Sequence, residues 1–279
     1  MARVDSNGVG IEYDVHGPDD GPAVVLLHGF PDSARMWRHQ VPALTEAGFR
    51  VVTPDLRGYG RSDKPEASDA YNLLFLAGDV LAVLDDAGIA RARVVGHDWG
   101  AALAWVVATV AADRVERLVV LSVGHPLAFR AAGMPQHERS WYMLLYQFEG
   151  IAEQWLSADG WANFREWCAH PDADAVTAEL ERDGSLTPAL SYYRANLPPA
   201  SFVEPPPELP PVTVPTMGIW SSGDRHLLER QMRDSADHCA GDFRYERIDG
   251  PGHWIMLDAP DEVNRLLLDF LGPPDGQPS

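Results

Sequence analysis

Short apolar runs alternate along the chain with longer segments in which apolar residues recur every three or four positions. Six runs have the composition of buried strands: residues 23–27, 50–53, 93–95, 118–122, 216–220 and 244–248. Between residues 71 and 87 the apolar positions follow helical spacing, and Gly88 supplies a stop. A similar helix begins at Pro260 and runs to Phe270. This alternation predicts a mostly parallel sheet with helices on both faces.

The alternation is interrupted between residues 126 and 215, where no strand-like run occurs. The interruption contains aromatic-rich segments with helical spacing at residues 140–148, 151–168 and 186–195. Prolines crowd residues 197–215 and predict a stiff connection back to the sheet. A proline-rich recognition segment for another domain is the alternative interpretation.

These patterns divide the chain into a core and an insertion. We expect the core to consist of residues 1–125 and 213–279, with a helical cap formed by residues 126–212 inserted between them. The last residues, 272–279, are rich in glycine and proline, and we expect them to be disordered.

Composition narrows the classes of function. The 279 residues include 22 basic and 41 acidic side chains, a formal net charge of −19, which argues against nucleic acid as a partner. No signal peptide and no apolar run of about 18 residues is found, so no membrane association is expected. Two cysteines, Cys168 and Cys239, are too few for a disulfide scaffold, which favours the cytoplasm.

Asp98 is the most informative residue in the sequence. It follows a predicted strand in the turn Gly96-His97-Asp98-Trp99-Gly100, and the flanking glycines permit a sharp strand-to-helix reversal that exposes the central side chain. An aspartate side chain in water has a pKa of about 3.9, so it is ionised at neutral pH and needs no base to become a nucleophile. Such a carboxylate suits attack on an electrophilic saturated carbon.

Backbone donors are expected beside this turn. The N–H groups of Phe30, in the turn after the first strong strand, and of Trp99 could form a two-donor oxyanion hole. The glycine-rich residues 54–62 resemble a phosphate-binding loop but lack the Walker lysine, so we interpret them as a structural loop.

Asp224 and His253 complete a candidate triad. Each follows a predicted strand, and the order nucleophile, acid, histidine is one of the known triad orders. His226 is an alternative base, but His253 precedes the last helix. The histidines expected to orient loops are His28, His97 and His125. No metal-ligand spacing and no cofactor motif is found.

Together these motifs resemble the α/β-hydrolase superfamily and, within it, the branch of soluble epoxide hydrolases and haloalkane dehalogenases. The matching positions are residues 28–31, 55–62 and 96–100 with Asp224 and His253, and the resemblance extends from about residue 8 to residue 271. It implies an α/β-hydrolase fold, with a mostly parallel eight-stranded sheet flanked by helices and a helical cap inserted after strand 6.

The resemblance also implies a pair of cap tyrosines that bind the epoxide oxygen. Tyr142 and Tyr193 are assigned to these positions, and helical spacing does not separate them from their neighbours Tyr146 and Tyr192. Phenols have a pKa near 10 and can donate a proton to the opening ring. Further residues expected to contact the substrate are His28, Trp99, Trp141 and Tyr146.

The expected activity is addition of water to a small apolar epoxide through an ester on Asp98, which water activated by His253 then hydrolyses. A haloalkane dehalogenase is the first alternative, although Phe30 stands where such enzymes carry asparagine. A fluoroacetate-type enzyme would carry arginine at Trp99. A non-catalytic ligand-binding protein of the same fold is the second alternative. The sequence leaves a homodimer open.

Overall fold

The computed structural model describes residues 1–272, so the expected disorder of residues 273–279 lies outside it. Within the described residues, eight strands form one sheet in the order β1-β2-β4-β3-β5-β6-β7-β8. They are β1 (Ala2–Ser6), β2 (Val9–His16), β3 (Ala23–Leu27), β4 (Arg50–Pro54), β5 (Ala92–His97), β6 (Val115–Leu121), β7 (Thr216–Ser221) and β8 (Phe243–Ile248). The predicted mostly parallel eight-stranded sheet flanked by helices is confirmed.

All six apolar runs form strands that pair in parallel, from β4 across to β8. The two additional strands, β1 and β2, pair antiparallel and form the edge next to β4. They are joined by Asn7-Gly8, whose φ angles are +54° and +85°. Asn-Gly is a strong sequence signal for a hairpin turn. The search for apolar runs did not locate this hairpin, but the Asn7-Gly8 dipeptide marks its position in the sequence.

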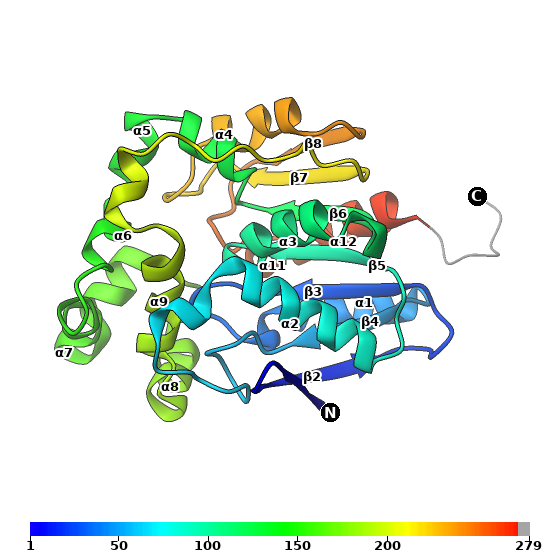
Figure 1. The fold of residues 1–279 in the computed structure, drawn as a ribbon, viewed down its shortest axis with the longest axis horizontal. Helices are drawn as coiled ribbons and strands as arrows, with labels where there is room; N and C mark the ends of the chain where they lie inside the picture. The colour runs from blue at the N-terminus through cyan, green and yellow to red at the C-terminus, as the bar shows by residue number, and fades with distance from the viewer. Residues whose placement is uncertain (273–279) are drawn as a thin grey trace.

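Helices cover both faces of the sheet: α2 and α3 lie on one face, and α1, α11 and α12 lie on the other (Figure 1). The core helices are α1 (Gln40–Glu46), α2 (Leu73–Asp86), α3 (Trp99–Val110), α10 (Glu229–Arg233), α11 (Ile255–Asp258) and α12 (Pro260–Leu271). Short 3₁₀ segments are η1 (Ala34–Trp37), η2 (Ser68–Tyr71), η3 (Ala112–Arg114), η4 (Pro199–Phe202) and η5 (Asp234–His238). The helices predicted before Gly88 and after Pro260 correspond to α2 and α12.

Between β6 and β7 the chain forms a helical layer over the ends of the parallel strands (Figure 1). Its helices are α4 (Pro126–Ala131), α5 (Met134–Arg139), α6 (Tyr142–Leu145), α7 (Ile151–Cys168), α8 (Ala173–Asp183) and α9 (Leu186–Asn196). These helices differ in two ways from those predicted from the spacing of apolar residues. Helix α8 was not recognised, and α7 is interrupted by non-helical backbone from Ala158 to Trp161.

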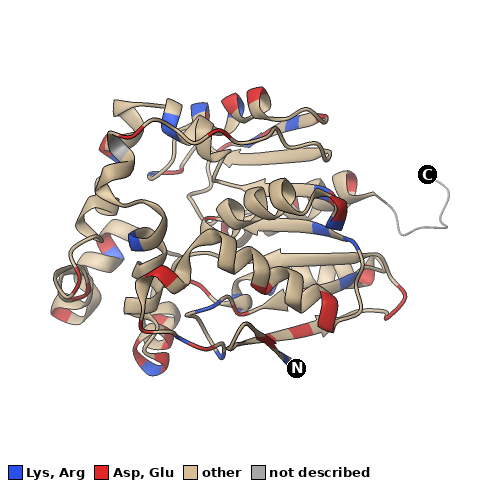
Figure 2. Cartoon of the chain, in the orientation of Figure 1, with Lys and Arg blue, Asp and Glu red and all other residues tan. Residues whose placement is uncertain are grey.

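Charged residues are distributed over the outer helices and loops of both parts of the molecule (Figure 2). None of the helices described for residues 1–272 is long and apolar enough to cross a membrane. A buried ion pair fixes the loop after β4: Arg57 donates through Nε and Nη2 to the two carboxylate oxygens of Asp79 in α2, at 2.8 and 2.6 Å. The two side chains are 6% and 4% exposed, so this pair fixes the loop to the helix in a medium of low dielectric constant.

Replacing Asp79 with alanine is expected to lower the free energy of unfolding by about 3–5 kcal/mol, because it leaves the Arg57 charge buried without a partner. The matched control is Asp85→Ala in the same helix. Asp85 is 67% exposed and pairs with Arg114, so its removal should cost less than about 1 kcal/mol. Urea denaturation of both variants measures the difference, and equal losses would contradict the interpretation.

Candidate active site

Asp98 lies at the junction between β5 and α3 in a strained conformation, with φ +53° and ψ −122°. Close packing of backbone around it requires glycine at two positions. A Cβ atom at Gly96 would lie 2.2 Å from the Gly100 carbonyl oxygen, and a Cβ atom at Gly100 would lie 2.1 Å from the Leu27 carbonyl oxygen. The glycines therefore let β5, α3 and β3 approach closely enough to hold the Asp98 side chain above the sheet.

The loop after β3 supplies a backbone donor to this carboxylate. The Phe30 N–H donates to Asp98 Oδ1 at 2.8 Å. Gly29 permits this contact, because a Cβ atom there would lie 2.5 Å from Asp98 Cβ. The Trp99 N–H is the first of α3, where the helix offers no acceptor for it. Of the two N–H groups predicted as an oxyanion hole, that of Phe30 contacts the Asp98 carboxylate, and that of Trp99 directly follows Asp98 in the chain.

His253 connects the two carboxylates of the site. Its Nδ1 lies 2.8 Å from Asp224 Oδ2, and its Nε2 lies 3.5 Å from Asp98 Oδ2. The other oxygen of Asp224 accepts the N–H groups of His226 and Leu227 at 2.8 and 2.9 Å. Asp224 is therefore fixed by backbone donors on one oxygen and orients the imidazole with the other.

Charge compensation governs protonation here. Burial alone would lower the pKa of His253, but the charges and hydrogen bonds of Asp224 and Asp98 outweigh it and raise this pKa from 6.5 to about 10. Burial would raise the pKa of Asp224, yet His253 holds that pKa below its usual value. The imidazole is consequently an imidazolium at neutral pH beside the charged Asp224 carboxylate.

Two further side chains hold the backbone of His253. His97 Nε2 and Ser122 Oγ each lie 3.0 Å from its carbonyl oxygen. Burial lowers the pKa of His97 to about 3, so this ring is neutral and donates its Nε2 proton to the carbonyl. His97 therefore positions the loop that carries His253, as expected from the sequence.

The structure separates the tyrosine pairs that the sequence left open. Tyr142 and Tyr193 both line the cavity with Asp98, and burial, followed by the Asp98 charge, raises the pKa of each phenol. The hydroxyl of Tyr192 instead donates to the Arg57 carbonyl at 2.7 Å. The Tyr146 ring packs beside Tyr193 at 5.0 Å, but Tyr146 does not line the cavity.

The cavity above Asp98 is narrow and largely aromatic. It is lined by Phe30, Asp98, Tyr142, Trp167, Tyr193, His226, His253 and Trp254. Its volume of about 10 Å³ holds roughly one water molecule. Sequence reasoning did not identify Trp167 as part of this wall, because its direction depends on the interruption in α7.

The expected substrate contacts require correction. His28 is fully buried and lies outside the cavity, since its Nε2 accepts the Leu56 N–H at 2.9 Å and its Nδ1 lies 3.2 Å from the Gly29 carbonyl oxygen. Trp141 is 45% exposed and packs on Trp155. Tyr146, as described above, is packed behind the wall. Trp99, the fourth expected contact, also does not line the cavity, and its ring packs on Tyr193 at 4.9 Å.

His226, the alternative base, also lines the cavity. The side chain that pairs with Asp224 Oδ2, however, is that of His253, whose Nδ1 lies 2.8 Å from this oxygen. Burial lowers the pKa of His226 to about 4, so its ring is neutral. The geometry therefore supports His253, oriented by Asp224, as the base of the site.

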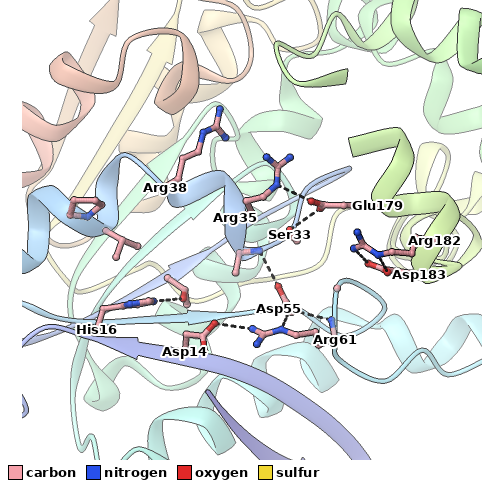
Figure 3. A pocket seen from close by; sticks show the side chains of 15 residues that line it. Asp14, His16, Ser33, Arg35, Arg38, Asp55, Arg61, Glu179, Arg182 and Asp183 are labelled. Carbon is pink, nitrogen blue, oxygen red and sulfur yellow. Dashed lines mark hydrogen bonds and ion pairs between the residues drawn. The ribbon is translucent and has the colours of Figure 1, made fainter. Parts of the chain in front are cut away.

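A larger hollow of about 570 Å³ lies elsewhere, between α8 and the β2–β4 edge (Figure 3). Its walls carry ion pairs, including Arg35 with Glu179 and Arg61 with Asp55, but none of the triad residues. Among residues 1–272, no three His, Cys, Asp or Glu side chains are grouped so as to hold a metal ion. The reactive groups of the molecule are thus gathered in the smaller cavity.

Comparisons with known proteins agree with this site. A family model described as the alpha/beta hydrolase fold matches residues 22–260. The chain is 33% identical to epoxide hydrolase A of Mycobacterium tuberculosis and to the AB hydrolase superfamily protein YfhM of Bacillus subtilis, with 96% of each chain covered in both cases. Among solved structures, an epoxide hydrolase from metagenomes of hot environments superimposes with a TM-score of 0.87 at 31% identity, covering 97% of this chain and 98% of that one.

The raised pKa of His253 predicts how stability depends on pH. Its stabilising effect is complete below the unfolded pKa of about 6.5 and is lost as pH rises toward 10, by at most about 1.4 kcal/mol per pH unit. The melting-temperature advantage of wild type over His253→Gln should therefore shrink between pH 6.5 and 10. The exposed His39→Gln variant is the control and should follow wild type. A constant difference for His253→Gln would argue against the buried imidazolium.

Proposed function

Because the chain belongs to the epoxide hydrolase family of the α/β-hydrolase fold, we propose that it adds water to an epoxide to form a vicinal diol. The observation that carries this proposal is the presence of two cavity-lining phenols, Tyr142 and Tyr193, beside the Asp98 carboxylate. Ring opening requires both an ionised nucleophile and a proton donor for the departing oxygen.

In the first step, Asp98 attacks one epoxide carbon. The Phe30 N–H occupies Oδ1, so Oδ2 is the attacking oxygen. A new carbon–oxygen bond forms as the ring carbon–oxygen bond breaks, and the opened oxygen takes a proton from Tyr142 or Tyr193. The product is a hydroxyalkyl ester whose carbonyl oxygen, Oδ1, already lies in the oxyanion hole.

Ester formation also prepares the second step. It removes the Asp98 charge, one of the charges that raise the pKa of His253, so the imidazolium can release its proton to the tyrosinate. Neutral His253 then accepts a proton from water as the water attacks the ester carbonyl. The N–H groups of Phe30 and Trp99 stabilise the oxyanion, typically by about 3 kcal/mol per donor. The bond from the carbonyl carbon to Oδ2 then breaks, the leaving alkoxide takes the proton of the new carboxyl group, and diol departs with Asp98 again a carboxylate and His253 again an imidazolium.

The setting of this reaction is part of the proposal. We assign residues 126–212 as the cap, whose aromatic wall supports a small apolar epoxide as substrate. The cysteines at 168 and 239 are free, which supports a reducing cytoplasm. The strongly acidic composition supports the exclusion of nucleic acid as a partner, and the chemistry above requires no cofactor.

Intact-mass analysis tests the ester. In the His253→Gln variant, incubation with styrene oxide should add one substrate mass to the protein, because the first step proceeds and the second stops. Asp98→Ala should show no adduct and no diol. Wild type that forms diol while His253→Gln gives no adduct would contradict the covalent scheme, and halide release from 1-haloalkanes without diol formation would favour a dehalogenase.

The tyrosine pair makes a second prediction. Tyr142→Phe and Tyr193→Phe should each slow ester formation by about 100-fold or more, as expected on loss of a positioned proton donor. Tyr192→Phe is the matched control in α9, since its hydroxyl bonds the Arg57 carbonyl, and it should react at nearly the wild-type rate. Single-turnover mixing with styrene oxide measures the rates. Equal slowing in all three variants would show that the assignment is wrong.

A further inference from the structure

The cavity above Asp98 is too small for any epoxide, so part of its wall must move when a substrate enters. Its volume of about 10 Å³ corresponds to a single water molecule. Either the whole cap lifts or a side chain in the wall swings aside. The contacts between cap and core distinguish these two routes.

Two cap helices are fixed to the core by hydrogen bonds. In α5, Arg139 Nη1 donates to the Asp224 carbonyl and Gln136 Nε2 donates to the His226 carbonyl, both at 2.8 Å. In α9, Asn196 Nδ2 donates to the Tyr71 carbonyl at 2.9 Å. Lifting either helix would break bonds that also position the triad loop or η2.

Helix α8 and the residues before it are fixed by charge. Arg35 and Arg38 in the core pair with Glu179 and Asp172 at 2.8 and 2.6 Å, and Figure 3 shows the first of these pairs at the edge of the larger hollow. His170 Nε2 lies 3.1 Å from the buried Asp32 carboxylate. The cap is thus attached to the core along this side as well.

The second half of α7 is attached less firmly. Within residues 1–272, its hydrogen bonds to the core are one from the His226 ring to the Cys168 carbonyl at the end of the segment and a long one, from Arg225 Nη1 to the Glu166 carbonyl oxygen at 3.5 Å. Backbone with positive φ bounds this short segment at both ends, at Asp159–Trp161 and at Ala169. Changes of backbone angle at these two points would rotate the segment, and the pair that joins it to α8, Arg165 with Asp174, is exposed to solvent.

Trp167 is the side chain that this segment contributes to the cavity wall. It is partly buried, and among residues 1–272 its indole N–H makes no hydrogen bond. Its ring packs against Tyr142 at 4.6 Å, His226 at 5.1 Å and Phe30 at 6.3 Å. All three are contacts between tilted rings, so the Trp167 ring can leave without exposing an unpaired donor in the core.

We infer that Trp167 is the access gate of the active site and limits the size of the substituent that an epoxide can carry. This inference rests on the proposed function for the identity of the substrate. When the Trp167 ring moves aside, the space it vacates beside Tyr142 and His226 admits terminal epoxides with a short or flat substituent. Epoxides with bulky groups on both carbons are excluded.

Steady-state kinetics test the size limit. For each enzyme, kcat/KM is measured with 1,2-epoxypropane and with trans-stilbene oxide. In Trp167→Ala, the ratio of kcat/KM for trans-stilbene oxide to kcat/KM for 1,2-epoxypropane should rise by about tenfold or more, a change typical of removing steric exclusion in a pocket. Trp167→Phe should give a smaller rise. Trp141→Ala is the matched control, because Trp141 is a cap tryptophan that is 45% exposed and lies outside the cavity.

A binding measurement separates this inference from the proposed function. The association rate of 2-naphthalenemethanol, an unreactive alcohol, is followed by stopped-flow fluorescence, and it should rise about tenfold in Trp167→Ala if a conformational step limits access in wild type. A wild-type enzyme that hydrolyses neither epoxide refutes the proposed function, whereas the association rate still decides the role of Trp167.

Thermal unfolding confirms that each variant is folded. If Trp167→Ala does not fold, Trp167→Phe and Trp167→Leu carry the test. Folded variants whose substrate ratio and association rate match those of Trp141→Ala would overturn the inference.

Discussion

The buried His253 imidazolium between two carboxylates is the interaction on which the site depends. A charge removed from water is costly unless it is paired, and here Asp224 and Asp98 provide the pairing at 2.8 and 3.5 Å. The three groups carry one net negative charge at rest. Alkylation of Asp98 would reduce that charge to zero. Because the Asp98 charge raises the pKa of His253, the imidazole holds its proton before the ester forms and releases it more easily afterwards.

This arrangement of charges requires backbone held at close range. The sheet brings the loops after β3, β5, β7 and β8 to one edge, but only glycine at positions 29, 96 and 100 lets those loops approach the Asp98 backbone. The carbonyl of His253 is in turn held by His97 and Ser122. The strain at Asp98 is therefore maintained by packing of the surrounding backbone.

Sequence patterns identified the features that depend on local chemistry. Apolar runs located six strands, and glycine spacing located the turn at Asp98. The patterns did not determine where side chains point. Tyr192 and Tyr193 are adjacent in α9, so their side chains diverge by about 100° around the helix, and only the fold shows that the first bonds the Arg57 carbonyl while the second lines the cavity. His28 and Trp141 were misassigned for the same reason.

The cap combines rigidity and access in different segments. Helices α5 and α8 share hydrogen bonds or ion pairs with the loops that carry Asp224 or the oxyanion donor, and α9 is bonded to η2, so large movement of α5 or α8 would disturb the reacting groups. The segment after the interruption in α7 has little such attachment and contributes an aromatic ring rather than a catalytic group. Restricting movement to that ring allows substrate to enter while Tyr142 and Tyr193 keep their positions above Asp98.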